Sequence, residues 1–260
     1  MVFSWLKNRR RSKSVARPFP GEWLQILDRN VAPYRVISPS DQQKLRDAIQ
    51  VFIAERNWEG CNGLAVTDEM RVTIDGYACL LLLGLEHDYF SHVLSVLVYP
   101  TDYRAPAKRN DIGVIMETED DRHGEAWYRG PVILSWKEIQ EDLTQPWDGQ
   151  NLILHEFAHQ LDMLDREVNG TPPLHSHDQA QRWNKVMTAE FSRLIRDARH
   201  GRPTLIDPYG TTNEAEFFAV TTECFFDAPR ELREEHPDLY ALLREYYGQD
   251  PAEWRHERAS

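Results

Sequence analysis

The feature that most constrains this chain is an apolar helical segment that carries two histidines four residues apart. Residues 152–162 read LILHEFAHQLD and contain the pattern His-Glu-x-x-His. Four residues of α-helix turn through about 400°, so His155 and His159 share a face, about 6 Å apart along the axis. Two imidazoles so placed can ligate one Zn²⁺, while Glu156 reaches a metal-bound water. Burying these polar groups unpaired would cost about 1–3 kcal/mol for each neutral group, and a metal would offset that cost.

A catalytic zinc site usually has a third protein ligand, and the sequence offers several. Asp165 lies six residues after His159, at the position of the third ligand in the longer motif H-E-x-x-H-x-x-G-x-x-H. That motif needs a glycine at which the chain turns after the second histidine, and this sequence has Asp162 there. His175 and His177 lie in a proline-flanked loop, a setting typical of solvated histidines. These three residues are therefore the weaker candidates.

A second apolar helical segment, residues 213–226, provides the stronger candidate. Glu216 lies within it, although Glu216 would equally form a capping box with Asn213 at the helix start. Glu223 follows seven residues later on the same face, where it either orients a metal ligand by a hydrogen bond or forms an ordinary salt bridge. Tyr209 lies just before this helix and could donate a hydrogen bond to an oxyanion, but it is one of ten tyrosines.

The pattern along the chain predicts one α+β domain that is mainly helical, with a small mixed β-sheet. We expect a basic N-terminal arm over residues 1–19, the domain over 20–248 and a tail over 249–260. Apolar periodicity and capping residues predict helices at about 22–30, 38–56, 67–83, 148–164, 178–199, 213–226 and 237–247. Short β-rich runs predict strands at 93–99, 113–116 and 131–136, with an acidic loop at 116–125.

Composition restricts the class of protein. The chain has 260 residues, 41% of them hydrophobic, and a formal charge of −12, which argues against wholesale disorder and against direct nucleic-acid binding. The longest apolar run, residues 78–83, is far shorter than the ~20 residues that a membrane span needs. Three cysteines without metal-ligand spacing and an N-terminus unlike a secretory signal predict a cytoplasmic protein.

The N-terminal arm departs from the acidic balance of the chain. Residues 1–17 contain six of the 30 basic residues and no acidic one. The sequence favours a frayed basic tail here. The alternative is an electrostatic anchor for an acidic partner or an anionic lipid surface.

In these segments the sequence resembles the Mlc titration factor A (MtfA) family of bacterial zinc metallopeptidases. HEFAHQLDMLD is followed about 60 residues later by YGTTNEAEFFAV. Three other stretches of the chain also resemble the family: 67–85, 124–136 and 223–229. The resemblance covers roughly residues 20–247. The YGTTNEAEFFAV segment is similar to the catalytic domain of anthrax lethal factor, which implies a zincin-type protease core.

The resemblance implies roles for individual residues. It implies one Zn²⁺ per chain held by three ligands: His155, His159 and Glu216. Glu156 matches the catalytic glutamate, and Tyr209 matches the tyrosine that assists the transition state. Asp162 falls in the family pattern HEFAHxLD, which implies a hydrogen bond that supports the site.

The family further implies a cytoplasmic, aminopeptidase-like enzyme that hydrolyses small peptide substrates. Its enterobacterial members bind the repressor Mlc and so influence glucose phosphotransferase expression, which makes a repressor of this type a candidate partner. The alternative is a module that sequesters a repressor and uses zinc only for structure. A non-peptide amidase is a third possibility. The β-rich segment 124–136 could form an edge strand beside the cleft, to which an extended peptide adds.

Overall fold

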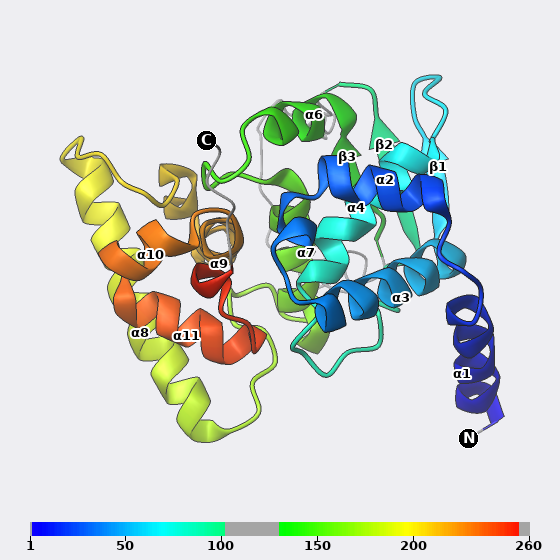
Figure 1. Cartoon of the computed structure of the whole chain (residues 1–260). Coiled ribbons are helices and arrows are strands. Elements are labelled where there is room, and N and C mark those ends of the chain that lie inside the picture. Colours follow the sequence, from blue (N-terminus) through cyan, green and yellow to red (C-terminus); the bar gives the residue numbers. More distant parts are fainter. Residues whose placement is uncertain (1, 102–129, 255–260) are drawn as a thin grey trace, which may run out of the picture.

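The structure, a computed structural model, describes residues 2–101 and 130–254 (Figure 1). The first half contains the helices α1 (Val2–Val15), α2 (Gly21–Asn30), α3 (Pro39–Glu55) and α4 (Asp68–Leu80) and the strands β1 (Asn57–Gly60) and β2 (Ser95–Tyr99). The second half contains strand β3 (Val132–Ser135) and helices α6 (Trp136–Thr144), α7 (Leu152–Asp162), α8 (His177–Arg199), α9 (Glu214–Asp227), α10 (Pro229–Glu235) and α11 (Pro237–Tyr247). The short 3₁₀ turns are η1 (Ala32–Arg35), η2 (Met163–Asp165), η3 (Pro208–Thr211) and η4 (Pro251–Glu253). The mainly helical α+β fold is thus confirmed.

Side-chain caps fix the starts of five of the expected helices, and one of these caps is Ser176, which accepts a hydrogen bond from the backbone of α8. Ser38 accepts a hydrogen bond from the backbone of α3, and Thr67 does the same for α4. Asn151 caps α7 through the amide of Leu154 at 3.0 Å, and Asn213 caps α9. Each cap satisfies a backbone N–H group that has no partner within its helix.

The three described strands form one sheet in the order β1-β2-β3, and both pairs are parallel. A small sheet was expected, but as a mixed one. The described pairing is parallel because a crossover through α4 joins β1 to β2, and such a connection returns the chain in the same direction. The strand expected at 113–116 and the loop expected at 116–125 lie outside the described residues.

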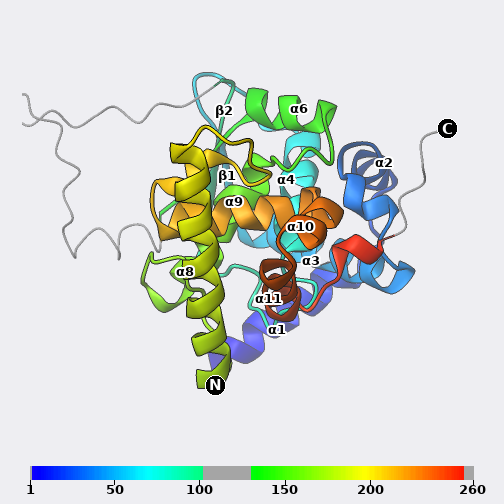
Figure 2. The same ribbon diagram turned by 90° about the vertical axis from the view of Figure 1, so that its left-hand side faces the viewer.

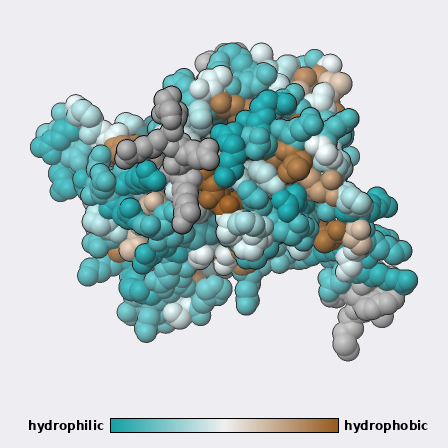
Figure 3. Space-filling view, in the orientation of Figure 1, coloured by the Kyte–Doolittle hydropathy of each residue, from teal (hydrophilic) through white to brown (hydrophobic). Residues whose placement is uncertain are grey.

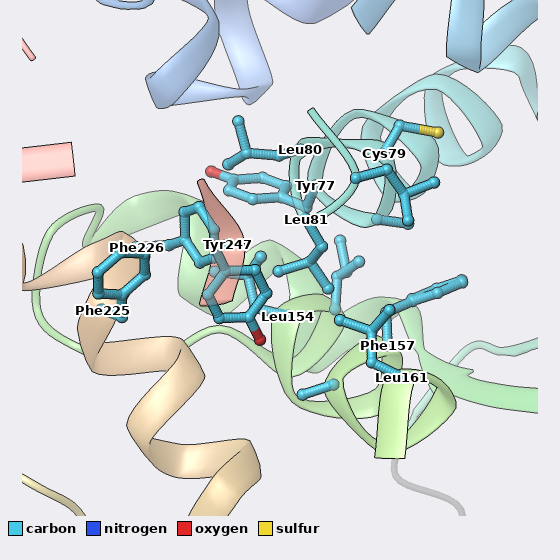
Figure 4. Close-up of a cluster of buried hydrophobic side chains, with 14 of the residues drawn as sticks. Tyr77, Cys79, Leu80, Leu81, Leu154, Phe157, Leu161, Phe225, Phe226 and Tyr247 are labelled. Atoms are coloured by element: carbon cyan, nitrogen blue, oxygen red, sulfur yellow. The ribbon is translucent and has the colours of Figure 1, made fainter. Parts of the chain in front are cut away.

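The core lies between helices that are far apart in the sequence. Figure 4 shows side chains of α4, α7, α9 and α11 meeting in one cluster, with Leu154 of α7 near its centre and Phe157 and Leu161 on one side of it. The Phe157 ring lies 5.1 Å from that of Phe90 and 5.7 Å from that of Phe52, measured between centroids. Helix α7 is therefore held by apolar contacts along most of its length, as its sequence predicts.

Helix α8 lies on the outer face, on the opposite side of α9 from the sheet (Figures 1 and 2). The surface in the orientation of Figure 1 is mostly hydrophilic, with hydrophobic residues in small separate spots (Figure 3). Within the two described ranges no helix is long and apolar enough to cross a bilayer.

The basic arm forms helix α1, where the sequence favoured a frayed tail. Arg11 explains the difference. It donates two hydrogen bonds of 2.8 Å to Glu55 of α3, and its guanidinium lies 4.6 Å from the centre of the Tyr89 ring. At the other end, the backbone of buried Ala252 donates a hydrogen bond to Tyr240, so part of the expected tail packs on α11. The division into arm, domain and tail stays a prediction.

Candidate metal centre

Helices α7 and α9 pack together and bring three of the expected ligands to one point. Nε2 of His155 lies 3.2 Å from Nε2 of His159 and 3.1 Å from Oε2 of Glu216. The third distance, from Nε2 of His159 to Oε2 of Glu216, is 3.4 Å. All three side chains are largely buried, with 13–18% of their surface exposed. The cluster forms because the second turn of α7 faces the first turn of α9.

These distances fit a metal ion. Zinc bonds of 2.0–2.1 Å in tetrahedral directions would separate neighbouring ligand atoms by about 3.3 Å. The three observed separations lie close to that value. Two imidazole nitrogens that face each other and a carboxylate at this distance also form a donor set that a cation satisfies better than a shared proton. The residues present therefore fit a zinc ion.

Glu223 fixes the orientation of the first histidine. Its Oε1 lies 2.7 Å from Nδ1 of His155, and its Oε2 accepts a hydrogen bond of 2.6 Å from the backbone of Asn151. The His155 ring donates from Nδ1 to this carboxylate, which leaves the lone pair of Nε2 directed at the other two ligands. The sequence alone allowed two interpretations of Glu223: a residue that orients a metal ligand by a hydrogen bond, or a partner in an ordinary salt bridge.

The pKa shifts reflect this arrangement. Burial alone would lower the pKa of His155, but hydrogen bonds with Glu216 and Glu223 raise it to about 10. Burial would raise the pKa of Glu216, but hydrogen bonds from the two histidines lower it to about 2. Glu216 is therefore ionised at neutral pH, and a proton and a metal ion compete for Nε2 of His155.

Glu156 lies beside the cluster on the same helix and is half-buried. Burial raises the pKa of its carboxyl group, although the two neighbouring histidines oppose the shift. A carboxyl group with a raised pKa next to a metal-ligand set has a property that a general base needs, because the raised pKa strengthens its affinity for the proton that it takes up.

Tyr209 lies at the rim of the cluster, in the 3₁₀ turn η3. It is 54% exposed, and its ring centre lies 6.0 Å from that of His155. Asp207 accepts a hydrogen bond from the Tyr209 backbone and so fixes the turn. Gly210 allows the turn to approach α9, because a Cβ atom there would lie 2.6 Å from the Val220 side chain. Burial, with Glu216 and Glu156 nearby, raises the pKa of the Tyr209 hydroxyl.

Asp162 is fully buried at the end of α7. Its Oδ2 accepts a hydrogen bond of 2.9 Å from the backbone of Gly170, and this contact ties the following loop to the helix. Its Oδ1 and the Nδ1 of His159 have no hydrogen-bond partner among the residues that the structure describes. Burial raises the pKa of Asp162, while nearby His159 lowers it. The observed contact of Asp162 is thus with the loop.

The other ligand candidates lie apart from the cluster. Asp165 is exposed and accepts a hydrogen bond from the backbone of Glu167. His175 is exposed in the loop before α8, His177 is exposed at the first position of that helix, and neither belongs to the group that could hold a metal. Asn213 caps the backbone of Glu216, but the Glu216 carboxylate turns toward the histidines, so the alternative of a full capping box is wrong.

Sequence reasoning missed the residues that hold the start of α7. Asp142 accepts a hydrogen bond of 2.8 Å from the amide of Leu152, and Asp227 accepts one of 2.9 Å from the amide of Gly149. Burial raises the pKa of Asp142 to about 6 and that of Asp227 to about 7. Asn151, directly before the apolar run, was the one signal in the sequence for a helix start at this position.

Comparisons with known proteins agree with this picture. Residues 5–248 match the family described as glucose-regulated metallo-peptidase M90. The chain is 41% identical to an uncharacterised protein of Synechocystis sp. over 93% of this chain and 89% of that protein. It is 33% identical to Mlc titration factor A of Pectobacterium atrosepticum, over 83% and 82% of the two chains. With Mlc titration factor A of Klebsiella pneumoniae it shares 29% identity over 88% and 86%.

Proposed function

The chain belongs to the family of glucose-regulated M90 metallopeptidases, and we propose that it is a zinc-dependent peptidase with aminopeptidase-like activity. The observation that carries this proposal is the convergence of His155, His159 and Glu216, with Glu156 beside them. A metal, a base and a half-exposed oxyanion donor are the parts that peptide hydrolysis needs.

His155, His159 and Glu216 would hold the ion. A bound Zn²⁺ would supply Lewis acidity, which polarises the substrate carbonyl and lowers the pKa of water toward about 7. Glu223 would keep Nδ1 of His155 protonated and so keep Nε2 available to the metal. Asp162 would support the opposite end of α7 through its contact with the loop at Gly170.

Glu156 would move the proton. Its carboxylate takes a proton from the attacking water and later delivers it to the leaving amine, so the same oxygen atoms serve as base and then as acid. Burial, which raises the pKa of Glu156, favours this double use.

Tyr209 would stabilise the transition state. Tyr209 is 54% exposed, and its hydroxyl can donate to the carbonyl oxygen as that oxygen becomes negative; removal of such a donor typically costs about 3–4 kcal/mol. Strand β3 lies at one side of the described sheet and packs against α7, so an extended peptide could pair with it. Protection of β3 amides from hydrogen exchange when a peptide inhibitor binds would support this position, and protection confined to other elements would contradict it.

Metal content tests the ligand set. We expect about one zinc per chain in the wild type and in Asp165→Ala, and a marked loss in Glu216→Ala. Asp165→Ala is the matched control, because it removes the other carboxylate that follows the histidine motif. Retention of zinc in Glu216→Ala together with loss in Asp165→Ala would contradict the proposed third ligand.

Glu156→Gln tests the chemistry. This variant should keep zinc and lose hydrolysis of aminoacyl anilides, because it preserves the shape of the side chain but cannot accept the proton. Simple amides assayed in parallel distinguish a peptidase from an amidase. Full activity in Glu156→Gln would show that another group is the base.

A second function is suggested by the printed name of two relatives, Mlc titration factor A. We propose that this chain also binds a transcriptional repressor of the Mlc type in the cytoplasm. If Glu156→Gln binds the repressor as the wild type does, binding and hydrolysis are separable. If the wild type binds repressor and zinc but hydrolyses no peptide, the alternative of a binding module with a structural zinc is favoured.

A further inference from the structure

A hollow of about 620 Å³ lies between α1, α3 and the loop before β2. None of its lining residues belongs to the metal centre. Its lining contains four cationic side chains and one carboxylate: Lys7, Arg10, Arg11, Arg56 and Glu55. This concentration of positive charge is unusual in a chain with a formal charge of −12. The volume falls within the range of about 300–1,000 Å³ that is typical of small-molecule sites.

Arg11 and Lys7 are held in place by ion pairs within the protein. Arg11 makes a two-pronged ion pair with Glu55 and also contacts Asp88, which in turn binds Lys7 at 2.6 Å. These contacts leave four cations against two carboxylates. The hollow therefore keeps a net positive charge after its internal ion pairs are counted.

Arg56 forms the inner wall. Its side chain is 2% exposed, and its Nη2 donates to the backbone carbonyls of Tyr89 and Phe90. Its Nε is buried and has no hydrogen-bond partner within residues 2–101 and 130–254. Burial lowers the pKa of the Arg56 guanidinium, although the nearby carboxyl groups of Glu55 and Asp75 oppose the shift.

Arg10 is the cation with the greatest freedom to bind. It is exposed, and within the described part of the chain its guanidinium forms no ion pair. Ser14 lies one turn further along α1 and lines the same hollow, where its hydroxyl donates a hydrogen bond of 3.4 Å to the backbone carbonyl of Arg10. Arginine forks match the geometry of phosphate oxygens and bind them in pairs of charge-assisted hydrogen bonds.

We propose that this hollow is a binding site for a multivalent phosphate group. The group belongs either to a free phosphorylated small molecule or to an anionic lipid headgroup at a membrane surface. The site does not depend on the metal centre or on the proposed peptidase activity.

Isothermal titration of the 260-residue chain with inorganic pyrophosphate tests the site. The wild type should bind one pyrophosphate saturably, and Arg10→Gln should bind it at least about tenfold more weakly, because one charge-assisted contact is lost. Arg17→Gln is the matched control: it removes the same charge from the same arm, but Arg17 does not line the hollow. His159→Ala should bind as the wild type does, because pyrophosphate at the metal centre would require that histidine.

Vesicles of phosphatidylserine and phosphatidylcholine identify the source of the phosphate. If the chain sediments with these mixed vesicles but not with pure phosphatidylcholine vesicles, and if pyrophosphate reverses that sedimentation, the site is assigned to a lipid headgroup. Pyrophosphate binding without sedimentation would assign it to a free small molecule. No pyrophosphate binding by the wild type, equal binding by Arg10→Gln, or loss of binding in His159→Ala would overturn the proposal.

Discussion

The carboxylate of Glu223 offers the sharpest test of how the metal centre is held. It is 8% exposed and accepts two short hydrogen bonds, one from Nδ1 of His155 and one from the backbone of Asn151. In Glu223→Gln the side chain keeps its shape but has a single acceptor oxygen. One of the two donors must therefore face an amide N–H group, and the negative charge behind His155 is lost.

The expected loss follows from these two contacts. Replacement of a hydrogen-bonded partner behind a metal ligand typically lowers metal affinity by about 10–100-fold, which corresponds to about 1.4–2.7 kcal/mol. The donor left without an acceptor should lower the free energy of unfolding by about 1–3 kcal/mol. Glu214→Gln is the control, because Glu214 is an exposed acid in the first turn of the same helix.

Competition with a chromophoric zinc chelator measures the affinity, and urea denaturation measures stability on the same samples. A Glu223→Gln variant that binds zinc within twofold of the wild type would refute the argument, whatever its stability. In that case Glu223 would support only the backbone at the start of α7. A similar loss of zinc affinity in Glu214→Gln would show that the overall negative charge of the helix, and not the specific contact with His155, determines the affinity.

Three further predictions concern the surroundings of the site. Burial raises the pKa of Asp227 from 3.8 to about 7. Between these two pH values the folded chain keeps the Asp227 proton, whereas the unfolded chain has lost it. The free energy of unfolding of the wild type therefore falls as the pH rises from about 4 to about 7. The free energy of unfolding of Asp227→Asn, measured by urea denaturation, should therefore increase relative to that of the wild type by about 2–3 kcal/mol between pH 5 and pH 8. A difference in unfolding free energy that does not change with pH would contradict the raised pKa. Gly210→Ala should cost about 1–3 kcal/mol in thermal unfolding, because its Cβ would meet Val220 at 2.6 Å, whereas Gly21→Ala, with open space around it, should be neutral. Phe157→Ala should cost about 3–5 kcal/mol in urea because its ring packs between two other phenyl rings, and a loss below 1 kcal/mol would show that the cavity collapses.

The helices could be predicted where the sequence marks their ends. Pro237 opens α11 and Ser38 caps α3, and the structure places both helices within a residue or two of expectation. The strand directions could not be predicted, because a β-rich run such as 131–136 fits a parallel or an antiparallel neighbour equally well. β1 was missed because Asn57–Gly60 is polar and only four residues long.

The metal centre could be predicted in part. The spacing of His155 and His159 fixes their common face, because a helix of known period connects them. Glu216 lies on another helix, so only the packing of α9 against α7 distinguishes it from Asp165, and spacing does not encode that packing. The resemblance to a known family implies roles for Glu216 and Tyr209 that spacing alone does not, and the structure brings both residues to the cluster.

The packing of α7 against α9 has a consequence for how the protein would hold the proposed zinc ion. The proposed ligands belong to two helices that contribute to one apolar core, with Phe157 and Phe225 inside it. In small zinc domains the ion itself holds the ligands together, so its removal unfolds them. Here the apolar core already holds the two helices together, so a bound zinc ion should be released to a chelator and taken up again while the protein stays folded. Activity would then follow the supply of free zinc reversibly, without synthesis of new protein.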